Sequence, residues 1–206
     1  MLNLLAFTSP HAEHSIYYIM SFHPFDISKA AQAAAVILRS QLNHSIGRLR
    51  LMKLLYIAHR KMLAKYGRPL FEANVVAMKH GPLHSEVYRA VSINGADDHE
   101  WGDFFENKGT QVVKLVKDPG ASLLSDAEVQ SLNDAVEEMS GYNDWEVVDI
   151  THTFPEWDKN YPDRKENTSH PIPMEDILNA VGMGEQAEEI QADLEEQAEF
   201  RRLLRS

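Results

Sequence analysis

Seven cationic side chains and no acidic one occur between residues 48 and 68, in a chain whose net charge is −11. Cations at this density can bind an acidic protein surface or a nucleic acid. The alternative, which we favour, is a solvated helix face whose charge is balanced by acids elsewhere in the fold, including the acidic C-terminal segment. The cations that we consider for a partner surface are Arg48, Arg50, Arg60, Lys61 and Lys65.

His80, His84 and Glu86 are close enough in sequence to suggest a metal site. Two metal-binding histidines at this spacing normally lie on one helix. Gly81-Pro82 interrupts the chain between them, so we expect no metal here. His80 is expected to be hydrogen-bonded in a turn, with His84 and Glu86 on the surface where a helix starts.

His152, next to Thr151 and near Trp157, has the residue types of a catalytic site. No nucleophile motif or glycine-rich phosphate loop accompanies it. We therefore expect a structural role, no catalytic residue, no cofactor and no enzyme activity.

Three large rings, Trp101, Phe104 and Phe105, lie in a short acidic segment and are hard to bury there. They are candidates for contacts with a partner, and a small satellite core is the alternative. Other amphipathic aromatic residues are more typical of core packing, with the polar tip hydrogen-bonded. These residues are Tyr56, Tyr66, Tyr88 and Trp157.

Composition limits the class of protein. With 44% hydrophobic and 25% charged residues the chain is expected to fold rather than stay disordered. The negative net charge argues against nucleic acid as a partner. The chain has no cysteine, and we found neither an apolar run of about 20 residues nor a signal peptide. A cytoplasmic protein without membrane association is expected.

The sequence also predicts the helices and strands that carry these residues. Asp26 can cap a helix over 27–40, and a broad apolar stripe predicts a central helix over 46–66 that stops at Gly67. Strands are predicted at 74–80 and 111–116, and we expect the two to pair. Between them, Pro82 is predicted to open a helix, followed by a loop over 96–109. Further expectations are a helix after the Ser125–Glu128 capping box, a helix over 143–152, an exposed loop over 158–171, a helix over 173–180 and a charged helix over 185–206.

The segment LMKLLYIAHRKMLAKYGRPLFEANVVAMKHGPLHSEVYRA resembles the signature of the Panacea antitoxin family, which includes SocA-like and phage-associated GepA-like proteins. THTFPEWDKN resembles the family's later T-H-x-x-P-x-W segment. His59 departs from the pattern, because an acid is frequent there, and so does the LHS at 83–85. The signature positions, most of which we expect to be structural, are Lys53, Leu55, Tyr56, Tyr66, Gly67, Pro69, Lys79, His80, Gly81, Pro82, Tyr88, Thr151, His152 and Trp157.

The resemblance spans about residues 26 to 181. It implies a mostly helical fold and an antitoxin that neutralises a cognate toxin by protein contact. In SocA-like members it also implies delivery of that toxin to an AAA+ protease, which makes a proteolytic adaptor the alternative function. A metal-dependent enzyme or a nucleic-acid-binding regulator is the further alternative.

We therefore predict a mainly α, single-domain protein with a small two-stranded β element, in the α+β class. The predicted divisions are an N-terminal extension (1–19), the antitoxin domain (20–184) and an acidic helical tail (185–206).

Overall fold

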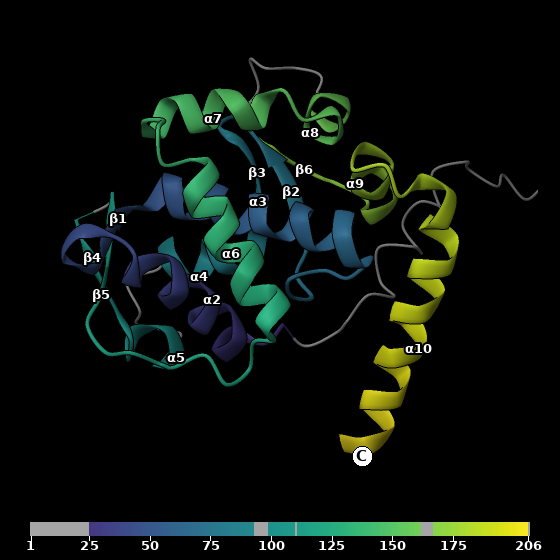
Figure 1. Cartoon of the computed structure of the whole chain (residues 1–206), viewed down its shortest axis with the longest axis horizontal. Coiled ribbons are helices and arrows are strands. Elements are labelled where there is room, and N and C mark those ends of the chain that lie inside the picture. The colour runs from purple at the N-terminus through teal and green to yellow at the C-terminus, as the bar shows by residue number, and fades with distance from the viewer. Residues whose placement is uncertain (1–24, 93–98, 110, 162–166, 206) are drawn as a thin grey trace, which may run out of the picture.

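The computed structural model describes residues 25–92, 99–109, 111–161 and 167–205. Helices pack around one central helix, and the chain also forms two small sheets (Figure 1). The mainly α class is confirmed, but the β content exceeds the two strands expected. The expected extension at 1–19 lies outside the described residues. Within the described ranges, no helix is long and apolar enough to cross a membrane.

Helix α3 (Arg48–Tyr66) is the centre of the core. Leu51, Leu55 and Ala58 are fully buried, and the helix runs through the middle of the molecule (Figure 1). It starts two residues later than predicted because Ser45–Gly47 is a strand. It ends as predicted at Gly67, which adopts φ 62° and donates its N–H to Leu63 O.

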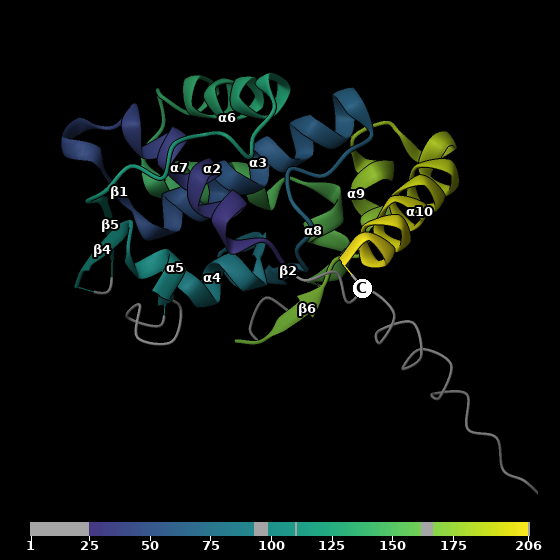
Figure 2. The same cartoon turned by 90° about the horizontal axis from the view of Figure 1, so that it is seen from below.

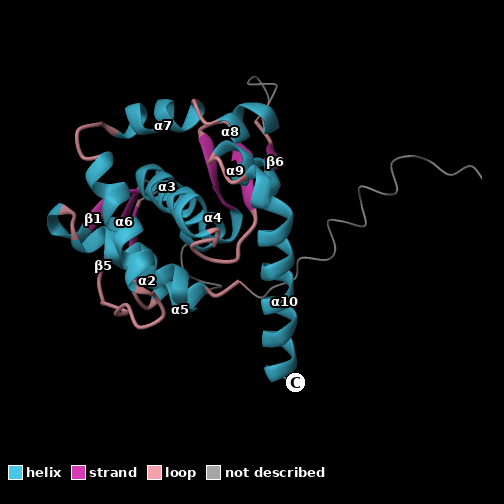
Figure 3. Cartoon of the chain, turned by 45° about the vertical axis from the view of Figure 1, so that its right-hand side comes forward, coloured by secondary structure: helices cyan, strands magenta, loops and turns pink. Residues whose placement is uncertain are grey.

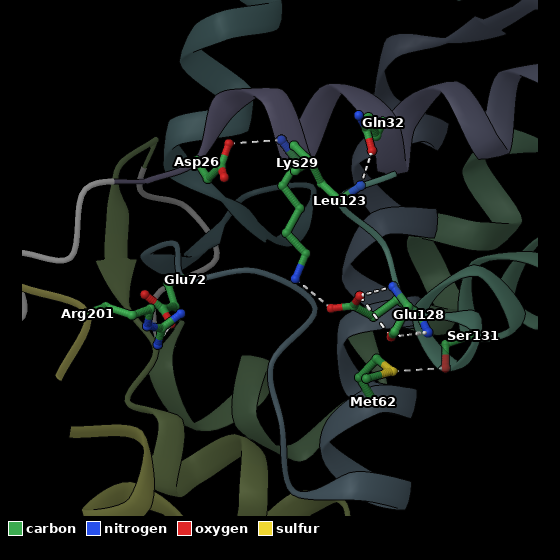
Figure 4. Close-up of polar contacts among 10 residues, drawn as sticks. Asp26, Lys29, Gln32, Met62, Glu72, Leu123, Glu128, Ser131 and Arg201 are labelled. Carbon is green, nitrogen blue, oxygen red and sulfur yellow. Dashed lines mark hydrogen bonds and ion pairs between the residues drawn. The ribbon is translucent and has the colours of Figure 1, made fainter. Parts of the chain in front are cut away.

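Helices α2 (Ile27–Arg39) and α6 (Asp126–Glu138) pack together and against α3. Both predicted caps are confirmed: the Asp26 side chain accepts from Lys29 N, and Ser125 and Glu128 form a capping box. Glu128 also forms an ion pair with Lys29, in which Nζ lies 2.6 Å from Oε1, and this pair links α2 to α6 (Figure 4).

The first sheet is antiparallel, with strand order β1-β5-β4. Strand β5 (Val112–Leu115) is the one predicted at 111–116. Strand β1 (Ser45–Gly47) and strand β4 (Phe105–Lys108) lie on either side of it. The expected loop over 96–109 is wrong in part, because α5 (His99–Gly102) and β4 lie within it.

The second sheet has the order β3-β2-β6 and is also antiparallel. Strand β2 (Val75–Met78) is the one predicted at 74–80, and it pairs with β3 (Gly81–His84) and β6 (Ser169–Pro171). The predicted pairing of 74–80 with 111–116 is therefore wrong. Each of the two strands instead pairs with a strand close to it in sequence, β2 with β3 and β5 with β4.

Pro82 does not open a helix, which corrects another prediction. It lies in β3 opposite Ala77, and α4 (Ser85–Ser92) starts only at Ser85. Proline lacks the N–H needed by a central strand, and it is tolerated here because β3 is at the edge of its sheet. Gly81, with φ 91°, lets the chain turn back directly after Met78, Lys79 and His80.

Helices at 143–152, 173–180 and 185–206 are confirmed, and the exposed loop expected at 158–171 is wrong in part. Pro155 opens a helix that extends to Asn160, and β6 occupies 169–171, so both ends of the expected loop are regular structure. The remaining elements are α7 (Asp144–His152), α8 (Pro155–Asn160), α9 (Met174–Ala180), α10 (Ala187–Arg205) and the 3-10 turns Leu42–His44 and Gly184–Gln186.

Helix α10 lies beside the body of the molecule and runs away from α9 (Figure 3). Ile190 packs close to Gly67 at the end of α3, and Arg201 forms an ion pair with Glu72 (Figure 4). Strands β1, β4 and β5 lie at one end of the molecule and α9 and α10 at the other (Figure 2). The signature segments meet between these ends, around α3, β3 and α7.

Candidate functional site

Lys53 on α3 lies at the centre of the signature segments. Its side chain is fully buried, and Nζ donates to Pro82 O at 2.8 Å. Burial lowers the pKa of Lys53 from its ordinary 10.5 to about 7. A lysine with this pKa has the proton affinity of a general base, but Lys53 is closed off from solvent and from any substrate. In this structure its role is to hold β3 against α3.

Gly81 lies between Lys53 and Thr151. A Cβ atom added at this glycine would come within 2.5 Å of Thr151 Oγ1 and 3.1 Å of Lys53 Nζ. Thr151 Oγ1 donates to Val148 O at 2.8 Å, one turn earlier in α7. The position therefore needs glycine twice, for its positive φ and for the close approach of three elements, α3, β3 and α7.

A second buried group surrounds Glu156, whose side chain is fully inaccessible. Tyr56 Oη donates to Glu156 Oε1 at 2.7 Å, and Arg60 Nε lies 2.7 Å from the same oxygen. The guanidinium of Arg60 also lies 3.8 Å from the centre of the Phe154 ring. Burial, the charge of Glu156 and this hydrogen bond raise the pKa of Tyr56 well above its ordinary value. The group joins α3 to α8 by charge-assisted hydrogen bonds.

His59 and His84 form a buried pair beside these two groups. His59 Nδ1 and His84 Nε2 are 3.1 Å apart, and the rings of His84 and Phe71 pack edge to face. Burial lowers the pKa of His59 to about 3 and that of His84 well below its ordinary value. Both rings are therefore neutral at pH 7, and one donates to the other. The surface position expected for His84 is wrong, because this side chain is 1% exposed.

The three residues considered for a metal site do not converge. His84 faces His59, His80 is on the surface with its ring against Trp145, and Glu86 binds the backbone and side chain of Asn74. In the part of the chain that the structure describes, no three histidine or carboxylate side chains are grouped to hold a metal ion.

The later signature segment connects α7 and α8 to the second sheet. The His152 ring stacks on Trp157, with centroids 4.0 Å apart and planes 15° from parallel. Trp157 Nε1 donates to Met78 O of β2 at 2.9 Å. The amphipathic ring is thus buried with its polar tip hydrogen-bonded.

The basic side chains of α3 mostly make contacts within the fold. Arg50 donates to Met139 O at 2.6 Å and Tyr142 O at 2.7 Å, and Lys61 pairs with Glu138 at 2.5 Å. Arg60 forms the ion pair with Glu156 described above. Of the five cations considered for a partner surface, the other two lie near aromatic rings: Arg48 is 5.9 Å from the centroid of the Tyr88 ring, and the exposed Lys65 is 5.2 Å from that of Tyr66.

The three rings expected at a partner surface are placed differently from one another. Trp101 and Phe105 stack with centroids 4.3 Å apart and are buried, so neither is accessible to a partner. Phe104 is half-buried, with Lys117 5.6 Å from its ring. The segment contributes mainly to the core because β4 turns Phe105 inward against β5.

Three residues of the buried centre, His59, His84 and Glu156, were not assigned to it from the sequence. The only local signal was the surplus of cations on α3, which required buried or nearby acids as partners. Which acids these are depends on contacts across about 100 residues of sequence.

Together these contacts define a helical domain in which Lys53, Tyr56, Thr151 and Trp157 of the signature are buried. Lys79 and His80 are exposed, and so is Tyr66 at 41%, which corrects the core packing expected for that residue. Residues 51–158 match the family model described as "Antitoxin SocA-like, Panacea domain". The match covers more than half of the chain and contains the whole buried centre. The chain belongs to this family.

One curated relative matches over a shorter stretch. Antitoxin SocA of Caulobacter vibrioides (strain NA1000 / CB15N) is 48% identical over 54 residues, which is 26% of this chain and 29% of that protein. The match thus spans less than a third of the curated relative. No solved structure matches the chain.

Proposed function

We propose that this protein is an antitoxin that neutralises a cognate toxin by direct protein contact. The family assignment supports the proposal, because the family model that matches residues 51–158, the buried centre included, describes SocA-like antitoxins. Because Lys53, Glu156 and Trp157 are enclosed, they maintain the scaffold, and the surface outside this centre is left to recognise the partner. A preformed surface on a rigid scaffold binds with little loss of conformational entropy.

The test uses the protein encoded by the neighbouring open reading frame, expressed from an inducible promoter. That neighbour is expected to stop growth when expressed alone, and co-expression with this chain is expected to restore it. The two purified proteins should co-elute in size-exclusion chromatography. A harmless neighbour, or growth arrest that this chain does not relieve, would contradict the proposal.

A second candidate is a proteolytic adaptor that delivers the toxin to an AAA+ protease. One observation favours it: on α10, which extends along the side of the body, Phe200 is 61% exposed and Leu204 71% exposed. Exposed apolar side chains at the end of a charged helix offer a contact surface for a protease.

The half-life of the toxin distinguishes the two candidates. Under the adaptor hypothesis the half-life shortens when this chain is present, and the double variant Phe200→Ala/Leu204→Ala restores it. Blocking by contact alone leaves the half-life unchanged or lengthens it. Equal half-lives with and without the wild-type chain would rule out the adaptor.

A further inference from the structure

Trp145 is exposed to an extent unusual for so large an apolar side chain. The other two tryptophans, Trp101 and Trp157, are each 1% exposed, whereas Trp145 is 60% exposed near the start of α7. An indole left in water forfeits the free energy of burying its apolar surface. Exposed tryptophans of this kind are enriched where a protein binds a partner.

The structure fixes the backbone at Trp145 and places one ring against its side chain. Asn143 Oδ1 accepts from Trp145 N at 3.0 Å and from Glu146 N at 3.1 Å, which caps α7. The His80 ring lies edge-on to the indole, with centroids 5.4 Å apart and planes at 74°. An exposed ring that is ordered before binding loses little entropy when a ligand stacks on it.

Two acids, Glu146 and Asp149, lie near Trp145 on α7, and the charge of Lys79 acts on the His80 ring that contacts the indole. Asp149 follows Trp145 by one helical turn on the same face of α7 and is exposed. Glu146 follows Trp145 in the chain, and one of its carboxylate oxygens accepts from Asn143 N at 2.7 Å. The cation nearest in sequence to His80 is Lys79. Burial, followed by the charges of Lys79 and Lys53, lowers the pKa of His80 below its ordinary value.

We propose that Trp145 and Asp149 bind an arginine side chain of a partner protein, with the guanidinium stacked on the indole and paired with the carboxylate. Arginine fits because its planar cation stacks on aromatic faces and binds carboxylates through two parallel hydrogen bonds. This inference rests on the proposed function only for the identity of the partner, the cognate toxin.

Other occupants fit the charges less well. A second copy of this chain would bring together two molecules of net charge −11, which repel. A nucleic acid would place its phosphates against Glu146 and Asp149. The acidic face therefore selects a cationic protein segment.

The probe is the peptide acetyl-Gly-Arg-Gly-amide, titrated into the full chain while the indole N–H signals are followed by NMR. The three tryptophans provide an internal control. The Trp145 signal should shift and saturate, and those of the buried Trp101 and Trp157 should not. The lysine peptide should bind several-fold more weakly, and the uncharged citrulline peptide should leave the signal unshifted.

Two matched variants test the carboxylate. Asp149→Asn should weaken binding of the arginine peptide by about fivefold, the effect of losing one charge-assisted contact. Glu137→Gln, at an exposed acid of α6, should leave binding unchanged. Equal shifts with arginine and citrulline, or equal binding by Asp149→Asn and wild type, would overturn the inference.

Growth rescue separates this inference from the proposed function. If Trp145→Ala rescues growth as well as wild type does, the toxin is not the partner of this site, the antitoxin proposal stands, and the peptide titration decides whether the arginine site exists. If wild type fails to rescue, the antitoxin proposal is contradicted, while the peptide titration still decides whether the arginine site exists.

Discussion

The buried centre around Glu156 and the outer face of α7 depart in opposite ways from the usual arrangement. In most proteins charged side chains are exposed and large apolar ones are buried. In the centre, charged and polar side chains are enclosed and bind one another, with Glu156 and Lys53 at most 1% exposed. On the outer face, the apolar ring of Trp145 is left in water. Buried polar groups are costly unless paired, and exposed large rings lose burial energy. The comparison indicates that the first region maintains the shape of the fold and the second is available to a partner.

The largest expected effect on stability comes from Glu156→Ala. The substitution leaves the Tyr56 hydroxyl and the Arg60 guanidinium without their acceptor, so we expect a loss of about 3 kcal/mol or more in the free energy of unfolding. Urea denaturation measures it. Glu137→Ala, at an exposed position, is the matched control and should change stability by less than about 0.5 kcal/mol. Equal effects of the two variants would remove the distinction between the regions.

Gly81→Ala should have the next largest effect. The new Cβ would meet Thr151 Oγ1, and the backbone would hold alanine at φ 91°. We therefore expect a loss of about 2 to 3 kcal/mol in the free energy of unfolding. Gly120→Ala is the control, because Gly120 also has positive φ, 76°, but has no atom within 4 Å of the added Cβ. It should cost about 1 kcal/mol. If Gly81→Ala costs no more than Gly120→Ala, close packing of α3, β3 and α7 is not what requires the glycine.

The buried pair His59 and His84 is expected to make the protein less stable in acid. The folded-state pKa values of His59 and His84 are lowered, so below about pH 6.5 the unfolded chain takes up protons that the folded chain does not. Each histidine should therefore reduce the free energy of unfolding by up to about 1.4 kcal/mol per pH unit, and for His59 this continues towards its folded pKa of about 3.

Urea denaturation at a series of pH values from 7.5 to about 4.5 checks this slope. His59→Asn should flatten it, whereas His44→Asn, at an exposed histidine, should leave it unchanged. A wild-type slope no steeper than that of His59→Asn would mean that the pair is not held neutral in the folded state.

The smallest stability effects are expected on the surface. Trp145→Ala and Arg201→Ala should each change the free energy of unfolding by less than about 1 kcal/mol, because the indole is mostly exposed and the ion pair with Glu72 is solvated. Thermal denaturation of both variants checks this. A large loss in Trp145→Ala would place that residue with the buried centre and weaken its assignment to a partner surface.

Local hydrogen bonds explain which parts of the fold were predictable. Asp26, the Ser125–Glu128 capping box and Gly67 act on residues within one turn, so helix starts and stops could be located from the sequence. Pro82 misled the prediction because proline favours both a first helical position and an edge strand. Which of the two occurs depends on β2, to which Pro82 is paired.

The sequence by itself determined the family, the helical class and the boundaries of most helices, since these depend on residue order and on contacts between near neighbours. Only the tertiary structure decided that β2 pairs with β6, that His84 meets His59, that Glu156 binds Tyr56 and Arg60, and that Trp101 is buried while Trp145 is exposed. These contacts join segments from 25 to about 100 residues apart in the chain. Their formation depends on which faces the packed helices present to one another, and no local pattern specifies that.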